Sequence, residues 1–212
     1  MPDEALFAAI ERYMAKDTQP AFHFILTTSN HPPFEYDVDS KGFPRQEVAA
    51  KLPPSIPQDK ATLNQLGHIW YADQEIGKFG KKIGGADTLF VLTGDHGERF
   101  SFATQVSRQE ESGVPCIFYG AGVTRQLLPD TMVGSHLQIL PALCELLLPA
   151  GSTYLSILPP LQKSDWAFNH RLVIEKGKLE LEKDLQDTQH LHIINAARQA
   201  GVWRILNGNK LP

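Results

Sequence analysis

The sequence lacks a surplus of charge of either sign, and it lacks any long apolar run. Among 212 residues, Lys and Arg number 20 and Asp and Glu number 24, so the formal net charge is −4. This balance provides no basic surface for nucleic acid and no polybasic segment for anionic lipid. No apolar stretch reaches the roughly 18 residues that a membrane-spanning helix needs. We therefore expect a soluble chain that does not bind nucleic acid.

Cysteine is also scarce. The two cysteines, Cys116 and Cys144, each stand in an apolar run. Free cysteine behaves as a small hydrophobe, so the pattern predicts two buried thiols. A pair of this kind does not suggest a disulfide framework.

Helical and strand patterns follow one another through the first 150 residues. Asp3 is a candidate N-cap for the first helix, and Gly84-Gly85 ends a long amphipathic helix. The unbroken apolar run over 88–93 is typical of a strand that is covered on both faces. The expected helices span 4–16, 59–83 and 136–148, and the expected strands span 21–28, 88–93 and 114–119.

Two polar segments and a weaker C-terminal pattern complete the chain. Residues 32–57 contain six prolines and predict a long surface loop, and residues 94–113 predict a second loop. Beyond residue 150, short antiparallel strands turning at Gly177 and a final helix are expected. The strands span 166–169, 171–176 and 178–181, and the helix spans 185–200.

This order of elements predicts an α/β fold with a largely parallel sheet flanked by helices and a small antiparallel β element at the C-terminal end. In such sheets, ligands bind beyond the carboxyl ends of the strands. Two polar clusters fall at such ends: Asn30-His31 after the first expected strand, and Asp95-His96 after the second.

Asp95 and His96 are the strongest candidates for chemistry. A carboxylate and an imidazole beside a buried strand can both turn toward one cation, and these donors suit Zn²⁺, Mn²⁺ or a similar metal. Gly94 and Gly97 allow the backbone to bend so that the two side chains converge. The alternative is a simple turn, in which Asp95 caps a local backbone group and His96 is solvated.

Five short segments carry a resemblance to a known family. Leu92 to Glu98 (LTGDHGE) resembles the metal-binding segment of the sulfatase/alkaline phosphatase superfamily. Order and spacing agree over roughly residues 3–148. The other matching segments are Thr27 to Phe34 (TTSNHPPF), Trp70 to Phe79 (WYADQEIGKF), and the pair Val114 to Ile117 (VPCI) and Ser135 to Leu143 (SHLQILPAL).

The resemblance implies an alkaline-phosphatase-like fold and particular residue roles. Asp95 and His96 would bind a divalent metal, either Mn²⁺ or Zn²⁺, with Ca²⁺ and Mg²⁺ as further candidates. His31 would contact the phosphate or sulfate of the substrate, or protonate a leaving oxygen. Arg99 would hold an anionic group. The alternatives are a turn histidine at 31 and a solvated cation at 99. His136 is expected to be structural, since Gln138 replaces the family's Asp.

The segment around His31 resembles the lipoteichoic acid synthase branch more than the arylsulfatases. That likeness implies a phosphoglycerol transferase acting on a glycerophospholipid head group. It also implies a parent protein in the plasma or inner membrane, with its catalytic domain outside the cytoplasm.

The family's nucleophile and its early acidic ligand are missing from this sequence. Residues 1–150 would then be the C-terminal part of the catalytic domain, and residues 151–212 an extension of the same domain. A zinc-like site uses about four ligands, and this chain offers two, so we expect weak or no metal binding and no turnover by the chain alone.

Two other functions stay open. A stand-alone hydrolase of phosphate or sulfate esters would need a nucleophile such as Thr27, Thr28 or Ser29. A non-catalytic structural or binding fragment would need none. An exposed sheet edge in such a fragment would favour a homodimer.

Overall fold

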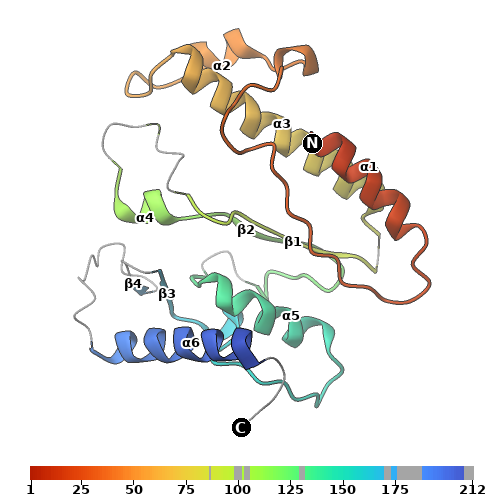
Figure 1. The fold of residues 1–212 in the computed structure, drawn as a ribbon, viewed down its shortest axis with the longest axis vertical. Coiled ribbons are helices and arrows are strands. Elements are labelled where there is room, and N and C mark those ends of the chain that lie inside the picture. Colours follow the sequence, from red (N-terminus) through yellow and green to blue (C-terminus); the bar gives the residue numbers. More distant parts are fainter. Residues whose placement is uncertain are drawn as a thin grey trace. The chain divides into compact units, whose positions relative to one another are not determined.

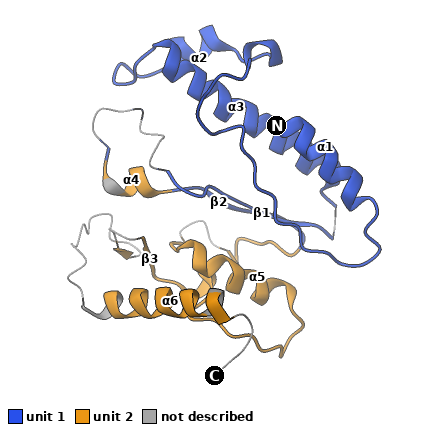
Figure 2. Cartoon of the chain, viewed as in Figure 1, with its two compact units in different colours: residues 1–106, 114–121 blue, residues 107–113, 122–212 orange. Residues whose placement is uncertain are grey.

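The computed structural model divides the chain into two compact units, which are coloured separately in Figure 2. Unit 1 contains residues 1–106 and 114–121, and unit 2 contains residues 107–113 and 122–212. The structure describes residues 1–85, 87–97, 102, 106–128, 132–169, 173–175 and 188–207.

Unit 1 is built around the long helix α3, Lys60–Ile83 (Figure 1). The side chain of Asp59 caps its first turn by accepting a hydrogen bond from the Thr62 backbone N at 2.8 Å, which lowers the pKa of Asp59. The helix ends as predicted before Gly84. Two further helices, α1 (Asp3–Met14) and α2 (Arg45–Lys51), pack against it.

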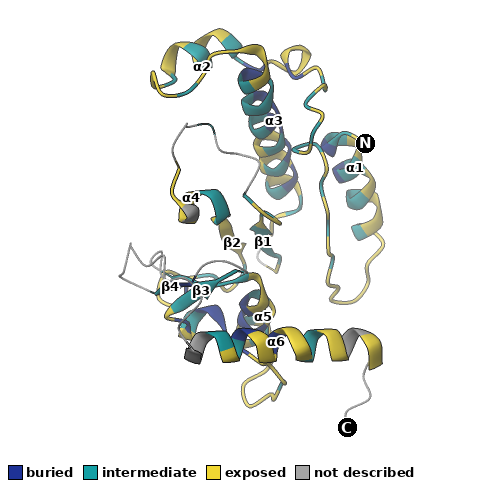
Figure 3. Cartoon of the chain, turned by 60° about the vertical axis from the view of Figure 1, so that its left-hand side comes forward, coloured by how far each residue is buried: buried dark blue, intermediate teal, exposed yellow. Residues whose placement is uncertain are grey.

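The core of unit 1 lies between α3 and the segment before α2, which includes a short 3-10 turn, η1 (Asp39–Lys41). Val38, Phe43 and Tyr71 are buried together. Gly67 precedes Tyr71 by one helical turn, so both face this core, and dark blue residues along α3 mark its buried face in Figure 3. Helix α1 packs against the C-terminal half of α3, where the rings of Phe7 and Phe79 stack 4.5 Å apart.

The sheet of unit 1 has two described strands, β1 (Leu89–Thr93) and β2 (Cys116–Gly120). They pair antiparallel, with Leu89 opposite Gly120 and Thr93 opposite Cys116. Both strands were expected, but the largely parallel sheet is not seen among the described residues. The expected strand over 21–28 is wrong, because a strand requires a hydrogen-bonded neighbour and no described segment pairs with this run.

Unit 2 contains the predicted helix near residue 136 and the small antiparallel element. The helix begins as a 3-10 turn, η2 (His136–Gln138), and continues as α5 (Ile139–Leu147). Strands β3 (Trp166–Phe168) and β4 (Val173–Glu175) pair antiparallel, as expected. The third expected strand and Gly177 lie outside the described residues. The unit also contains α4 (Arg108–Ser112), η3 (Leu161–Lys163) and α6 (Thr188–Asn207).

Several local expectations need correction. Asp3 is not the N-cap of α1; Pro2 occupies that position, and Asp3 is fully buried in the first turn. The loop over 32–57 contains η1 and α2, and the loop over 94–113 contains α4. Cys116 is exposed and Cys144 half-buried, so neither is the buried thiol that was expected. Among the described helices, none has the length and apolar character needed to cross a bilayer.

Candidate functional site

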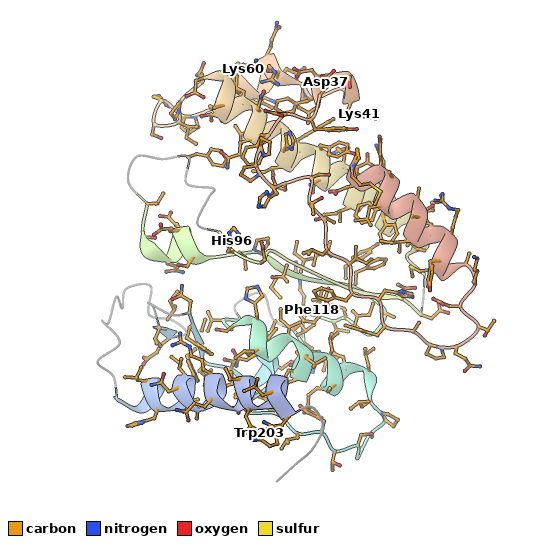
Figure 4. The ribbon with its side chains drawn as sticks, viewed as in Figure 1. Asp37, Lys41, Lys60, His96, Phe118 and Trp203 are labelled. Atoms are coloured by element: carbon orange, nitrogen blue, oxygen red, sulfur yellow. The ribbon has the colours of Figure 1, made fainter. Side chains whose placement is uncertain are left out.

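Asp95 and His96 lie directly beyond the carboxyl end of β1, where Figure 4 labels His96. The Asp95 Oδ1 accepts a hydrogen bond from the His96 backbone N at 3.0 Å, and the Asp95 Oδ2 lies 3.6 Å from the His96 Nε2. The second distance is too long for a hydrogen bond. The carboxylate therefore caps the turn with one oxygen and faces the imidazole with the other.

Both side chains are open to solvent. The exposed fraction is 77% for the Asp95 side chain and 42% for that of His96. Exposure lets both groups reach a cation, and their adjacency brings one negative charge and one neutral nitrogen donor to the same point. The turn and the metal interpretations are thus compatible, because the capping bond uses only one carboxylate oxygen.

The close packing of Gly94 explains how the chain reaches this turn. A Cβ added at Gly94 would lie 3.2 Å from the Val114 Cγ1 and 3.3 Å from its Cβ. Val114 leads into β2, whose pairing places Cys116 opposite Thr93. Val114 therefore leaves little room for a side chain at residue 94. A glycine at this position allows the chain to turn after β1, just before Asp95.

The described residues supply two donors of a metal site. Within the described part of the chain, no group of three or more His, Cys, Asp or Glu side chains could hold a metal ion. Zn²⁺ takes about four ligands, and other divalent cations take more. Asp95 and His96 fit a borderline divalent metal as part of a ligand set and do not form a whole site.

His31 belongs to a separate turn. Its backbone N donates to the Thr28 carbonyl at 3.2 Å, and its Nδ1 lies 2.6 Å from the Pro32 carbonyl oxygen. A carbonyl can only accept, so the Nδ1 carries a proton. The residue is exposed, and in this tautomer Nε2 is the ring nitrogen that carries the lone pair.

Three residues that the sequence did not link to His31, namely Asp3, Ser29 and His68, hold this turn. Ser29 donates its hydroxyl to the Asp3 Oδ1 at 2.7 Å and accepts from the Asp3 backbone N at 3.0 Å. The Ser29 carbonyl accepts from the His68 Nδ1 at 2.5 Å. Asp3 lies 26 residues and His68 lies 39 residues from Ser29, so no local pattern could reveal the contacts. The position of His68 on the apolar face of α3 was the available signal.

The remaining residues that the sequence analysis named are Arg99, Gln138 and His136. Arg99 lies outside the described residues. Gln138 is buried, with its Oε1 accepting from the Ser135 backbone N at 2.9 Å and its Nε2 donating to the Pro159 carbonyl at 3.2 Å. Gln138 therefore caps the start of η2, and His136 beside it is exposed.

The carboxylate–imidazole pair therefore follows a strand that is half-buried, whereas a strand covered on both faces was expected. The sulfatase family model matches residues 1–149, so the chain belongs to the sulfatase family. The predicted membership is confirmed at this level, and it makes the protein a sulfatase-like ester hydrolase or transferase of a family that generally binds a divalent metal. No curated protein and no solved structure matches the chain significantly.

Proposed function

We propose that this chain carries part of the active site of a metal-dependent enzyme that hydrolyses or transfers phosphate or sulfate esters. The observation that carries the proposal is the exposed Asp95–His96 pair at the end of β1, inside the region that matches the sulfatase family. A bound divalent cation would neutralise charge on the transferring group and activate an attacking oxygen. Asp95 and His96 would hold that cation.

His31 acts on the substrate in this proposal. With its Nδ1 proton engaged at the Pro32 carbonyl, the ring would present Nε2 to a substrate oxygen. In its doubly protonated form the ring would donate from Nε2, either to the anionic group or to a leaving oxygen. Arg99 adds a fixed positive charge for the same anionic group. Both roles rest on the matching family segments.

Within the family, we infer a phosphoglycerol transferase of the lipoteichoic acid synthase type. The run from Ser29 to Phe34 supports this branch, and the substrate class is then a glycerophospholipid head group. The parent protein would be anchored in the plasma or inner membrane, with its catalytic domain outside the cytoplasm. Residues 1–150 would form the C-terminal part of that domain and residues 151–212 its extension.

We also propose that residues 1–212 contain an incomplete active site. Two ligands give weak metal binding, and the nucleophile would come from outside this sequence. Isothermal titration of the chain with MnCl₂ and ZnCl₂ tests the first point, with Asp95→Ala as the probe and the exposed Asp73→Ala as the matched control. We expect dissociation constants well above micromolar. Stoichiometric sub-micromolar binding that Asp95→Ala abolishes would contradict an incomplete site.

The activity test uses the protein expressed from its complete coding sequence. Membranes containing it are supplied with phosphatidylglycerol and Mn²⁺, and transfer of glycerol phosphate is followed. Asp95→Ala and His31→Ala are expected to lower the rate by at least about 100-fold, the scale of one lost acid or electrostatic contact, while Asp73→Ala leaves it unchanged. Hydrolysis of p-nitrophenyl phosphate or p-nitrophenyl sulfate by residues 1–212 alone would instead establish a stand-alone hydrolase.

A further inference from the structure

The turn that carries His31 is fixed through Ser29 by two buried, ionisable side chains. Asp3 is fully buried and holds the Ser29 hydroxyl at 2.7 Å. His68 is 3% exposed and donates to the Ser29 carbonyl at 2.5 Å. Ser29 is therefore held at its side chain by α1 and at its backbone by α3. The Thr28 carbonyl on the other side accepts from the His31 backbone N, so the two helices set the position of the whole turn.

This arrangement is costly for the folded protein. The Nε2 of His68, the Oδ2 of Asp3 and the Oδ1 of Asn30 are buried without a hydrogen-bond partner among the described residues. Buried polar atoms without partners destabilise a fold, and an apolar residue of similar shape in their place is often neutral or stabilising. A costly network of this kind is expected where position matters more than stability.

The ring packing of His68 and its hydrogen bond require different properties of the side chain. The edge of its ring meets Phe34 at a centroid distance of 5.3 Å and Tyr36 at 6.4 Å. A phenylalanine would satisfy this aromatic packing equally well. What phenylalanine lacks is the Nδ1–H that reaches the Ser29 carbonyl, and this donor is the feature that needs a histidine.

We propose that His68 is a positioning residue for His31, acting through the Ser29 carbonyl to hold the turn in which the His31 Nδ1–H stays bonded to the Pro32 carbonyl. The inference rests on the proposed function only for the use that His31 makes of its Nε2. The positioning itself is a property of residues 1–212.

The test measures the tautomer of His31 by ¹⁵N NMR of the full 212-residue chain, at a pH where the ring is neutral. The wild type is expected to carry its proton on Nδ1. His68→Phe should shift the ratio of the two tautomers by about tenfold toward Nε2–H, the scale of one lost hydrogen bond. His68→Asn, whose amide nitrogen stands where Nδ1 stood, should restore the ratio to within about twofold.

His68→Gln and His23→Phe are the matched controls. Glutamine places its donor one atom further out, so it should resemble His68→Phe, and His23 bonds only to the exposed Asp17 among the described contacts, so its variant should resemble the wild type. An unchanged tautomer ratio in His68→Phe, or equal restoration by Asn and Gln, would overturn the proposal. If His68→Phe does not fold, the difference in the His31 tautomer ratio between His68→Asn and His68→Gln decides alone.

A second measurement separates this proposal from the proposed function. Inorganic phosphate is titrated into the wild-type chain while the His31 ring resonances are followed. Phosphate that leaves those resonances unmoved counts against a substrate role for His31, yet the tautomer ratios still decide whether His68 positions it. In the complete gene product, the transfer assay should show kcat lowered about tenfold in His68→Phe, with KM within about twofold and kcat recovered in His68→Asn.

Discussion

At the scale of single residues, the hydrogen bond between Tyr154 and Glu145 gives a pH-dependent signature of unit 2. The Tyr154 hydroxyl donates to the Glu145 Oε1 at 2.7 Å. This bond raises the pKa of Tyr154 to about 12 and lowers the pKa of Glu145. The raised tyrosine pKa contributes stability below the unfolded value near 10, and this contribution is lost as the pH rises through about 12.

Ultraviolet titration of tyrosine ionisation measures this signature. We expect a step at about pH 12 in the wild type, missing in Tyr154→Phe and moved toward pH 10 in Glu145→Gln, because the amide no longer carries the negative charge. A wild-type step that Glu145→Gln leaves in place would show that the contact does not form in solution.

Gly94 offers a second residue-scale prediction, at the candidate metal segment. Gly94→Ala brings a Cβ to 3.2 Å from the Val114 Cγ1, so we expect a free energy of unfolding lowered by about 1–3 kcal/mol through overpacking. Combining Gly94→Ala with Val114→Ala should recover part of that loss, since alanine at 114 leaves room for the added Cβ. Denaturant unfolding of the four proteins in the double-mutant cycle measures the coupling. Additive losses would mean that Val114 does not press on Gly94.

At the scale of elements, substitution by alanine should change the stability of the protein in opposite directions at two glycines of α3. A Cβ at Gly67 would lie 2.6 Å from the Val38 Cγ2, whereas a Cβ at Gly77 meets nothing within 4 Å. Gly77→Ala should stabilise the protein by about 0.5–1 kcal/mol, as expected for a helix interior. Gly67→Ala should destabilise it by about 1–3 kcal/mol through overpacking, despite the same gain in helix propensity.

Thermal or denaturant unfolding of the two variants makes the comparison, and circular dichroism of the folded state confirms that α3 persists in both. Gly67→Ala matching or exceeding the wild type would show that the core of Val38, Phe43 and Tyr71 does not pack against α3 as described.

The elements that sequence predicts well are those stabilised by neighbours in the chain. Helix α3 follows from its apolar period and the glycines after Ile83, which are both local signals. The strand expected over 21–28 failed because an apolar, β-rich run specifies a strand only where another strand pairs with it. Asp3 failed as a cap because its contact with Ser29, 26 residues away, outweighs the local preference.

The sequence also predicted some parts of the candidate site and not others. Asp95 and His96 could be predicted as a pair, because they are adjacent and follow a strand. The sequence could not predict that Asp95 can cap the turn and still face a cation. That depends on which carboxylate oxygen accepts the backbone hydrogen bond. His68 could not be linked to His31 either, because their connection runs through the backbone carbonyl of Ser29, which lies 39 residues from His68. The metal, the substrate and the role of Arg99 stay predictions.

At the scale of the whole molecule, residues 21–27 present an exposed apolar run. Phe22, Phe24 and Leu26 are 71%, 84% and 67% exposed, and no backbone hydrogen bond joins this run to another described residue. Open backbone groups beside apolar side chains favour pairing with another chain. We propose that two copies associate through this run, and an antiparallel arrangement would place Phe22 of each copy opposite Leu26 of the other.

Sedimentation velocity over a range of concentrations tests the association. We expect a reversible dimer that Phe24→Lys weakens by at least about tenfold, the effect of placing a charge in an apolar contact. Tyr13→Lys, which changes an equally exposed aromatic residue on α1, should leave the equilibrium unchanged. A monomer at all concentrations, or equal effects of the two variants, would contradict pairing through this run.

The same exposed run has a thermodynamic consequence. Any surface that covers Phe22, Phe24 and Leu26 removes large apolar side chains from water, and such burial lowers the heat capacity of the complex. The enthalpy of association should therefore become steadily more negative as temperature rises. Calorimetry at several temperatures then reports whether these three side chains are covered, whichever partner covers them.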